Sequence, residues 1–96
     1  MSDKPTKVFA TRRAERDLRR APRRIQERFQ VWVNAVETMG LREVRRNPGL
    51  HDEPRRGDRE GQRSVRLNLQ WRAIYRESES GELIIVTVEE VTPHAY

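Results

Sequence analysis

The chain has 96 residues, of which 34% are hydrophobic, so we expect one cytoplasmic domain over residues 1–96 and no room for a second. It contains no cysteine, which excludes a disulfide framework and a thiolate metal site. It also contains no run of roughly 20 apolar residues and no apolar signal region, so we expect no membrane partner. Its 20 Lys and Arg outnumber its 15 Asp and Glu, and the net charge of +5 favours a nucleic acid or an acidic protein as partner. A GC-rich genome, which favours arginine codons, would give the same excess of basic residues.

The first part of the chain predicts a strand followed by a helix. Residues 7–10 are short and apolar at their centre, as expected of a strand or its end. Thr11 suits the N-cap of a helix in which Ala14 and Leu18 lie four positions apart among charged residues. Pro22 ends this segment and also suits the first turn of a following helix, so the two helices are expected to form a hairpin.

The second helix has the clearest period in the chain. Its apolar residues follow positions i, i+4, i+7, i+8 and i+11, which places them on one face of a helix. They are Ile25, Phe29, Trp32, Val33 and Val36. Gly40 follows Met39 where a C-cap is expected, and the apolar stripe needs a sheet face to pack against.

Residues 41–61 show neither a helical nor a strand period. Prolines and glycines are scattered between the charged residues of this segment. We therefore expect a loop of about twenty residues, which is long for so small a domain and is typical of a functional or a disordered segment.

The last third of the chain predicts a three-stranded antiparallel meander. Apolar and polar residues alternate over 64–68 and again over 71–76, with a short connection that is compatible with a hairpin. A turn around Gly81 leads to a third strand over 83–91, which Pro93 ends. The element order predicts an α+β fold in which the N-terminal strand and the helical hairpin pack on one face of a small antiparallel sheet.

Strand parity separates two sets of side chains in this meander. The set expected to face the helices is Val65, Leu67, Trp71, Ala73 and Tyr75. The set expected on the opposite face is Ser64, Arg66, Asn68, Arg72, Ile74 and Arg76. Three arginines on one side of a small sheet repel one another unless an anion or a carboxylate lies nearby. A solvated face with Glu89 as a partial counterion is the simpler explanation, and a phosphate-binding face is the alternative.

The loop and the C-terminal tail favour the phosphate-binding alternative. The loop carries His51 and Arg56, and His94 and Tyr96 follow the last strand, so both segments are placed to close over the open face. Cleavage of RNA by its own 2′-hydroxyl needs a proton acceptor, a proton donor and positive charge at the phosphate. Histidine titrates near neutral pH and arginine stays charged, so this residue set suits that reaction. The sequence contains no metal-ligand spacing, and we expect no metal and no cofactor.

Motifs in the same region resemble those of a known family. The loop LHDEPRRGDREG (50–61) leads into the strand RSVRL (63–67) and then WRAIY (71–75), and the chain closes with VEEVTPHAY (88–96). A loop of the type Leu-His…Pro-x-x-Gly-Asp-x-x-Gly, followed by a Ser-Val strand and a Trp-Arg strand, resembles the HigB-like branch of the RelE/ParE toxin superfamily. The remaining segments match the family by the order of their elements.

The resemblance implies a RelE-like fold and a toxin of a type II toxin–antitoxin pair that cleaves mRNA in the ribosomal A site. The implied partners are a cognate antitoxin of the helix-turn-helix kind, the ribosome with its mRNA, and operator DNA through the antitoxin alone. The candidate catalytic residues are His51, Arg72, His94 and Tyr96. The candidate substrate-binding residues are Arg56, Arg66 and Arg76, of which the last two rest on strand parity.

The chain departs from the family pattern at two places. The loop is longer between His51 and Gly57 than in the shortest family members, and Ala95 stands where Asp is expected before the tail tyrosine. A methyl group cannot orient a histidine or transfer a proton, so we hypothesise that Ala95 attenuates the toxin. Two other functions stay open: a ParE-like inhibitor of DNA gyrase that shares the fold, and a basic module that binds RNA or an antitoxin without catalysis.

Overall fold

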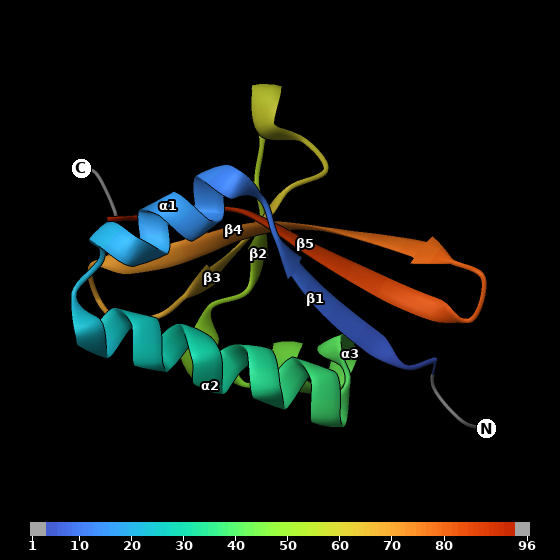
Figure 1. The fold of residues 1–96 in the computed structure, drawn as a ribbon. Coiled ribbons are helices and arrows are strands. Elements are labelled where there is room, and N and C mark those ends of the chain that lie inside the picture. Colours follow the sequence, from blue (N-terminus) through green and yellow to red (C-terminus); the bar gives the residue numbers. More distant parts are fainter. Residues whose placement is uncertain (1–3, 94–96) are drawn as a thin grey trace.

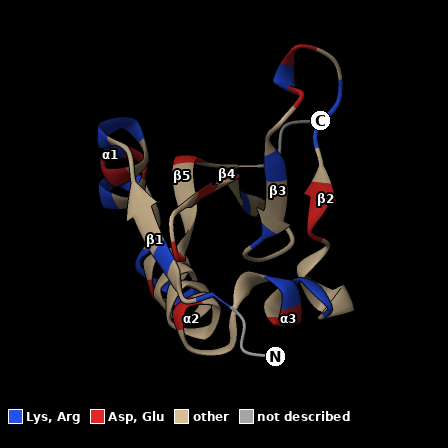
Figure 2. Cartoon of the chain, turned by 90° about the vertical axis from the view of Figure 1, so that its right-hand side faces the viewer, with Lys and Arg blue, Asp and Glu red and all other residues tan. Residues whose placement is uncertain are grey.

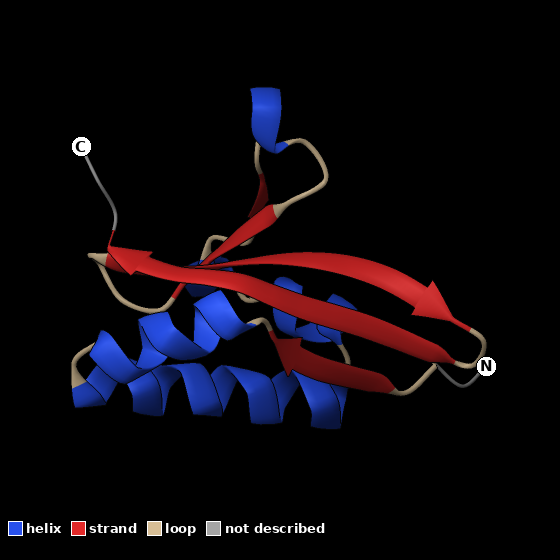
Figure 3. Ribbon diagram, turned by 45° about the horizontal axis from the view of Figure 1, so that its top comes forward, coloured by secondary structure: helices blue, strands red, loops and turns tan. Residues whose placement is uncertain are grey.

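The computed structural model describes residues 4–93, which form a five-stranded mixed sheet with α1 and α2 on one face (Figures 1 and 3). The strands are β1 (Thr6–Ala10), β2 (Glu53–Pro54), β3 (Arg63–Arg66), β4 (Trp71–Ser80) and β5 (Leu83–Pro93), in the order β1-β5-β4-β3-β2. The helices are α1 (Arg12–Arg20), α2 (Arg23–Met39) and α3 (Leu41–Arg45), with short 3₁₀ turns η1 (Pro48–Leu50) and η2 (Gly57–Arg59). The predicted α+β class is confirmed, and His94, Ala95 and Tyr96 lie outside the described residues.

The predicted helix boundaries agree with the structure because local signals set them. The Thr11 hydroxyl accepts a hydrogen bond from the Ala14 N–H at 3.1 Å and so caps α1. Pro22 stands at the N-cap of α2, where its missing N–H leaves no unpaired donor. Gly40 ends α2 with φ +90°, a backbone conformation that favours glycine, and its N–H donates to the Val36 carbonyl at 2.9 Å.

The core lies between α2 and the near face of the sheet. Four residues of the predicted helical stripe are buried: Ile25, Phe29, Trp32 and Val36. They pack against Val65, Leu67, Ala73, Tyr75, Val86, Val88 and Val91 of the sheet region. The Trp32 and Tyr75 rings meet at a centroid distance of 5.5 Å, and Val33 is half-buried at the margin of the cluster. Trp71, which parity also assigned to this face, is half-buried against the same core.

Two features of the sheet were not visible in the sequence pattern. The N-terminal strand is hydrogen-bonded within the sheet, because β1 pairs in parallel with β5 from Thr6–Ile84 to Ala10–Val88. The β4–β5 hairpin is also longer than the alternation suggested, since the polar end of β4 continues to Ser80 opposite Leu83. Figure 3 shows this hairpin extending well beyond β3.

The segment 41–61 is not the unstructured loop that the sequence predicted. It begins with α3, whose Leu41 and Val44 are buried in the core, and continues through η1, β2 and η2. An i, i+3 pair in a five-residue helix is too short to produce a recognisable period, which is why the pattern failed here. In residues 4–93, no helix is long and apolar enough to cross a membrane.

Candidate functional site

Strand alternation places a set of polar side chains on the sheet face opposite the core. Glu53 of β2 is paired with Ser64 of β3, and Arg66 of β3 is paired with Arg72 of β4. Because side chains two positions apart share a face, these four residues belong to the same side of the sheet. Figure 2 shows β2 beside β3 at this edge of the sheet. The side of the sheet away from α2 therefore carries a charged surface, as parity predicted.

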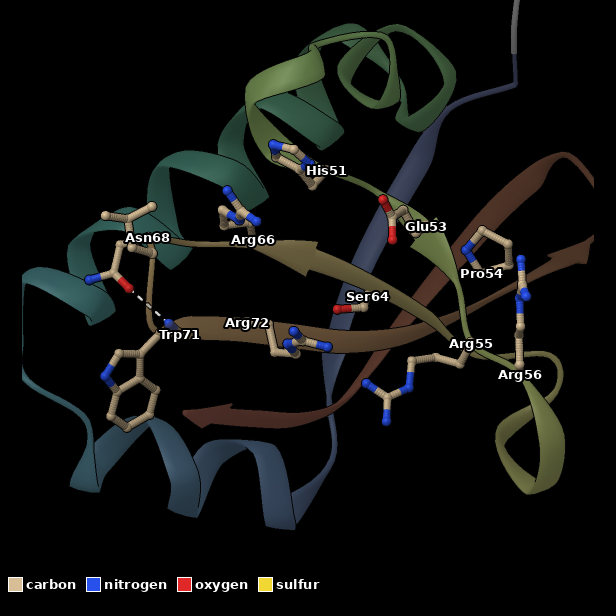
Figure 4. Close-up of a pocket in the computed structure, with 11 residues that line it drawn as sticks. His51, Glu53, Pro54, Arg55, Arg56, Ser64, Arg66, Asn68, Trp71 and Arg72 are labelled. Carbon is tan, nitrogen blue, oxygen red and sulfur yellow. Dashed lines mark hydrogen bonds between the residues drawn. The ribbon is translucent and has the colours of Figure 1, made fainter. Parts of the chain in front are cut away.

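This face contains a cavity of about 690 Å³ (Figure 4). It is lined by His51, Glu53, Pro54, Arg55, Arg56, Ser64, Arg66, Asn68, Leu69, Trp71 and Arg72. The lining comes from the segment around β2, from β3 and from the start of β4, so three neighbouring strands form it. Among residues 4–93, the lining includes four arginines, one histidine and one carboxylate, that of Glu53, and the cavity suits an anion.

The structure brings together four of the five described residues that the sequence singled out. His51, Arg56, Arg66 and Arg72 all line the cavity. Arg76 does not line it: its Nε donates to the Glu89 carboxylate at 3.0 Å, and its Nη1 donates to the Glu60 carbonyl at 3.5 Å. His94 and Tyr96 lie outside the described residues, so their proposed place beside the cavity stays a prediction.

A buried carboxylate fixes the segment that carries His51 and Glu53. Asp52 lies between them in sequence and points to the opposite side, with a side chain only 1% exposed. It accepts hydrogen bonds from the Tyr75 hydroxyl at 2.5 Å and from Arg63 Nε at 2.6 Å, and Arg45 Nε lies 3.6 Å away. Since neighbouring side chains alternate along a strand and β2 begins at Glu53, holding Asp52 inward turns Glu53 outward to the cavity, which His51 also lines.

His51 has a backbone conformation that side-chain-bearing residues rarely adopt. Its φ of +44° and ψ of +49° lie in the left-handed region, and no other non-glycine residue in the described range 4–93 has a positive φ. The His51 N–H donates to the Pro48 carbonyl at 3.2 Å, which closes η1 just before it. The turn on one side and Asp52 on the other hold this strained residue at the cavity wall.

A β-bulge explains why Arg76 is engaged elsewhere. Ile74 pairs with Glu90 and Tyr75 pairs with Val88, so Glu89 is an extra residue in β5. Glu89 accepts hydrogen bonds from Gln62 Nε2 at 2.7 Å and from Arg76. Glu90 pairs with Arg59 of η2, so two consecutive carboxylates bind the residues of the loop that follows the cavity. Arg76 pairs with the bulged Glu89 and so helps to hold this loop.

Sequence reasoning missed Glu53 and the Asp52 contacts. Glu53 supplies the cavity's carboxylate, and Asp52 holds the segment through residues that lie 11 and 23 positions further along the chain. The available signal was the alternation of Asp52 and Glu53, which becomes visible only when the start of β2 is treated as extended rather than as a loop. Among residues 4–93, no group of three or more His, Asp or Glu side chains is arranged to hold a metal ion.

The Tyr75 hydroxyl should make stability fall at alkaline pH. Burial, together with its hydrogen bond to Asp52, raises the pKa of Tyr75 well above its ordinary value of 10.0. Above about pH 10 the unfolded chain releases this proton while the folded chain keeps it, so the free energy of unfolding should fall by about 1.4 kcal/mol per pH unit. Urea unfolding of the wild type and of Tyr75→Phe should show this added slope only in the wild type. Equal slopes in both proteins would contradict the assignment.

Comparison with known proteins identifies the fold. No protein-family model matches the chain, and no curated protein matches it. Among solved structures, the YoeB/ParE toxin from Agrobacterium tumefaciens is 25% identical, with 93% of this chain and 99% of that chain covered and a TM-score of 0.65. The RelBE2 toxin–antitoxin complex from Mycobacterium tuberculosis is 23% identical, with 94% of this chain and 99% of that chain covered and a TM-score of 0.67. The DinJ–YafQ toxin–antitoxin complex of E. coli is 15% identical, with 93% of this chain and 92% of that chain covered and a TM-score of 0.72.

These matches agree with the resemblance drawn from the sequence motifs. The expected RelE-like fold is confirmed, and the chain is similar to a toxin described as YoeB/ParE, as expected of the RelE/ParE superfamily. The finer assignment to the HigB-like branch stays a prediction.

Proposed function

We propose that this chain is the toxin of a toxin–antitoxin pair and a metal-independent endoribonuclease that cleaves mRNA in the ribosomal A site. The observation on which the proposal depends is the cavity that gathers His51, Glu53 and four arginines on one sheet face. The chain also has the fold of toxins that were solved with their antitoxins, the RelBE2 and DinJ–YafQ complexes. A cognate helix-turn-helix antitoxin is the proposed inhibitor, and operator DNA is bound through it alone.

The cavity residues suit cleavage by the RNA's own 2′-hydroxyl. The 2′-oxygen forms a bond to the adjacent phosphorus, the bond from phosphorus to the 5′-oxygen breaks, and the product ends in a 2′,3′-cyclic phosphate. A base must take the 2′-proton and an acid must protonate the 5′-oxygen. His51 and Glu53 are the titratable groups of the cavity, and His94 and Tyr96 are the candidates from the tail. In this proposal Arg66 and Arg72, which pair across β3 and β4 and line the cavity, stabilise charge on the phosphate oxygens.

The ribosome has a role in this proposal because the cavity offers few strong proton-transfer groups. Holding the reacting atoms in line is worth several kcal/mol of barrier, and a decoding ribosome fixes the mRNA backbone in one geometry. We therefore expect weak or no cleavage of free RNA. Arg55 and Arg56 at the other end of the cavity would bind phosphates that flank the scissile bond.

The experiment is primer-extension mapping of mRNA cleavage in a purified translation system. We expect cuts within translated codons by the wild type, faster cuts by Ala95→Asp if Ala95 attenuates proton transfer, and weak or no cuts when ribosomes are omitted. Ready cleavage of the free transcript would contradict ribosome dependence. Absence of cleavage by both proteins would overturn the nuclease proposal, and inhibition of DNA gyrase supercoiling would then support the ParE-like alternative. An equal rate for the two proteins would remove the attenuation hypothesis.

A further inference from the structure

The arm formed by residues 55–62 is held to β5 at its base by Gln62. Figure 1 shows the yellow tip of this arm, η2, projecting away from the sheet. The Gln62 residue is 8% exposed, and its side-chain amide donates to the Glu89 carboxylate at 2.7 Å and accepts from Arg59 Nε at 2.7 Å. Because a cation and a carboxylate pair with its two ends, the amide is fixed in one orientation.

Gln62 also contacts the residue at which the arm begins. Its carbonyl accepts a hydrogen bond from the Arg55 N–H at 2.8 Å, one step beyond the pairing of Pro54 with Arg63 between β2 and β3. Gln62 therefore binds the bulge of β5 through its side chain and Arg55 through its main chain. A displacement of Gln62 would move Arg55 with it.

Arg55 is the cavity residue that this link reaches. It is half-buried, and in Figure 4 its side chain extends from the end of β2 toward the middle of the cavity. Arg55 forms no ion pair with another residue of the range 4–93. Its guanidinium group is therefore available to bind an anion in the cavity.

Further contacts keep the base of the arm in place. Gly61 has φ +91°, and a Cβ there would lie 2.6 Å from Arg76 Nη1, so the chain packs closely against Arg76 just before Gln62. The largely buried Glu90 carboxylate pairs with Arg59 and lies 3.3 Å from Arg13 of α1. The arm is thus fastened to both β5 and α1, as expected of a preorganised wall of the cavity.

We propose that Gln62 is a positioning residue of the candidate site: by joining the Glu89 carboxylate to the Arg55 main chain, it holds the Arg55 guanidinium group where the cavity binds a phosphate next to the scissile one. The identity of that phosphate rests on the proposed function, whereas the link itself rests on the contacts above. Since Arg55 binds a flanking phosphate and not the reacting one, Gln62 should affect substrate binding far more than the chemical step.

The test compares Gln62→Ala with Gln30→Ala, and neither substitution changes the charge. Gln30 is an exposed residue of α2 whose amide donates to Asn34. The probe is labelled hexathymidylate, which has the phosphates but no 2′-hydroxyl, with its affinity measured by fluorescence anisotropy. Gln62→Ala should weaken binding about five- to tenfold and raise KM for mRNA-programmed ribosomes by a similar factor, with kcat within about twofold. Gln30→Ala should stay within about twofold of the wild type throughout.

Exchange of the two partners provides a rescue. Gln62→Glu alone places a carboxylate against that of Glu89, and it should weaken probe binding at least as much as Gln62→Ala. Adding Glu89→Gln restores the hydrogen bond with donor and acceptor exchanged and with the original net charge. Affinity should then return to within about twofold of the wild type. Absence of this rescue would show that the contact between Gln62 and Glu89 is not what holds Arg55.

Arg55→Ala tests the route by which Gln62 acts. In that background Gln62→Ala should change probe affinity by less than about 1.5-fold, because the group that it positions is already gone. A full effect there would overturn the positioning role. Should Gln62→Ala be unfolded at the assay temperature, Gln62→Glu and its rescue decide the question. A wild type that cleaves no mRNA removes the nuclease proposal and leaves the binding test intact, and a wild type that does not bind the probe overturns this inference alone.

Discussion

Asp52→Ala should lower the free energy of unfolding by about 3–5 kcal/mol, the largest stability effect we expect from a single substitution in the described chain. The Asp52 carboxylate is buried and accepts hydrogen bonds from Tyr75 at 2.5 Å and from Arg63 at 2.6 Å. Its removal leaves a buried hydroxyl donor without its acceptor and two guanidinium groups, those of Arg45 and Arg63, without their shared counterion.

Urea unfolding followed by circular dichroism checks this prediction, with Asp58→Ala as the matched control. Asp58 is exposed in η2 and forms no ion pair with the residues of the described segment, so its loss should change stability by less than about 0.5 kcal/mol. Asp52→Asn should fall between the two, because the amide still accepts from Tyr75 but carries no charge. Equal stability of Asp52→Ala and Asp58→Ala would show that the buried contacts contribute nothing measurable.

The same substitution links stability to the site. Asp52 lies between His51 and Glu53, and its contacts hold both of these residues at the cavity wall. Since His51 has a strained backbone with φ +44°, release of the anchor should let the segment relax away from that conformation. Asp52 is thus a positioning residue, and its loss should lower cleavage even at temperatures where the variant is fully folded.

Periodic features of the structure could be predicted from the sequence, and pairings between distant residues could not. The stripe from Ile25 to Val36 and the alternation over 64–76 each repeat within one element, so a pattern of a few residues is enough to assign a face. The same logic placed Arg66 and Arg72 on the outer face, where the cavity lies.

The missed features depend on partners that are far away in the chain. Asp52 became an internal anchor because Arg63 and Tyr75 face it from two neighbouring strands. The parallel pairing of β1 with β5 joins residues more than seventy positions apart, and no local pattern specifies it. The bulge at Glu89 changed the parity of β5, so Val88 and Val91 both face the core although they lie three positions apart.

Arg76 shows the limit of parity most clearly. It is on the predicted face, but a face does not determine which groups a long side chain reaches. The bulged carboxylate of Glu89 lies 3.0 Å from its Nε, and Arg76 is therefore directed to β5 and away from the cavity. Arg72 lies four positions earlier on the same strand and lines the cavity. Arg72 and Arg76 therefore show that two residues on the same face of one strand need not both line the cavity.

Arg72→Ala should lower the rate of ribosome-dependent mRNA cleavage by roughly 10²–10³-fold, as expected when a donor to a transition-state oxyanion is removed. Arg76→Ala, the same change on the same face of the same strand, should cost less than about threefold, because Arg76 stabilises the loop through Glu89 rather than contacting the phosphate. Arg72→Lys should recover only part of the rate, since an ammonium group keeps the charge but lacks the planar bidentate fork.

Single-turnover cleavage in the purified translation system measures these rates, and circular dichroism confirms that each variant is folded. Arg66 and Arg72 pair across β3 and β4 and both line the cavity, so an anion bound there would be attracted by two positive charges. Inorganic phosphate should therefore raise the melting temperature of the wild type more than that of Arg72→Ala. If Arg76→Ala proved as damaging to cleavage as Arg72→Ala, the reacting phosphate would have to lie outside the cavity, over the bulge.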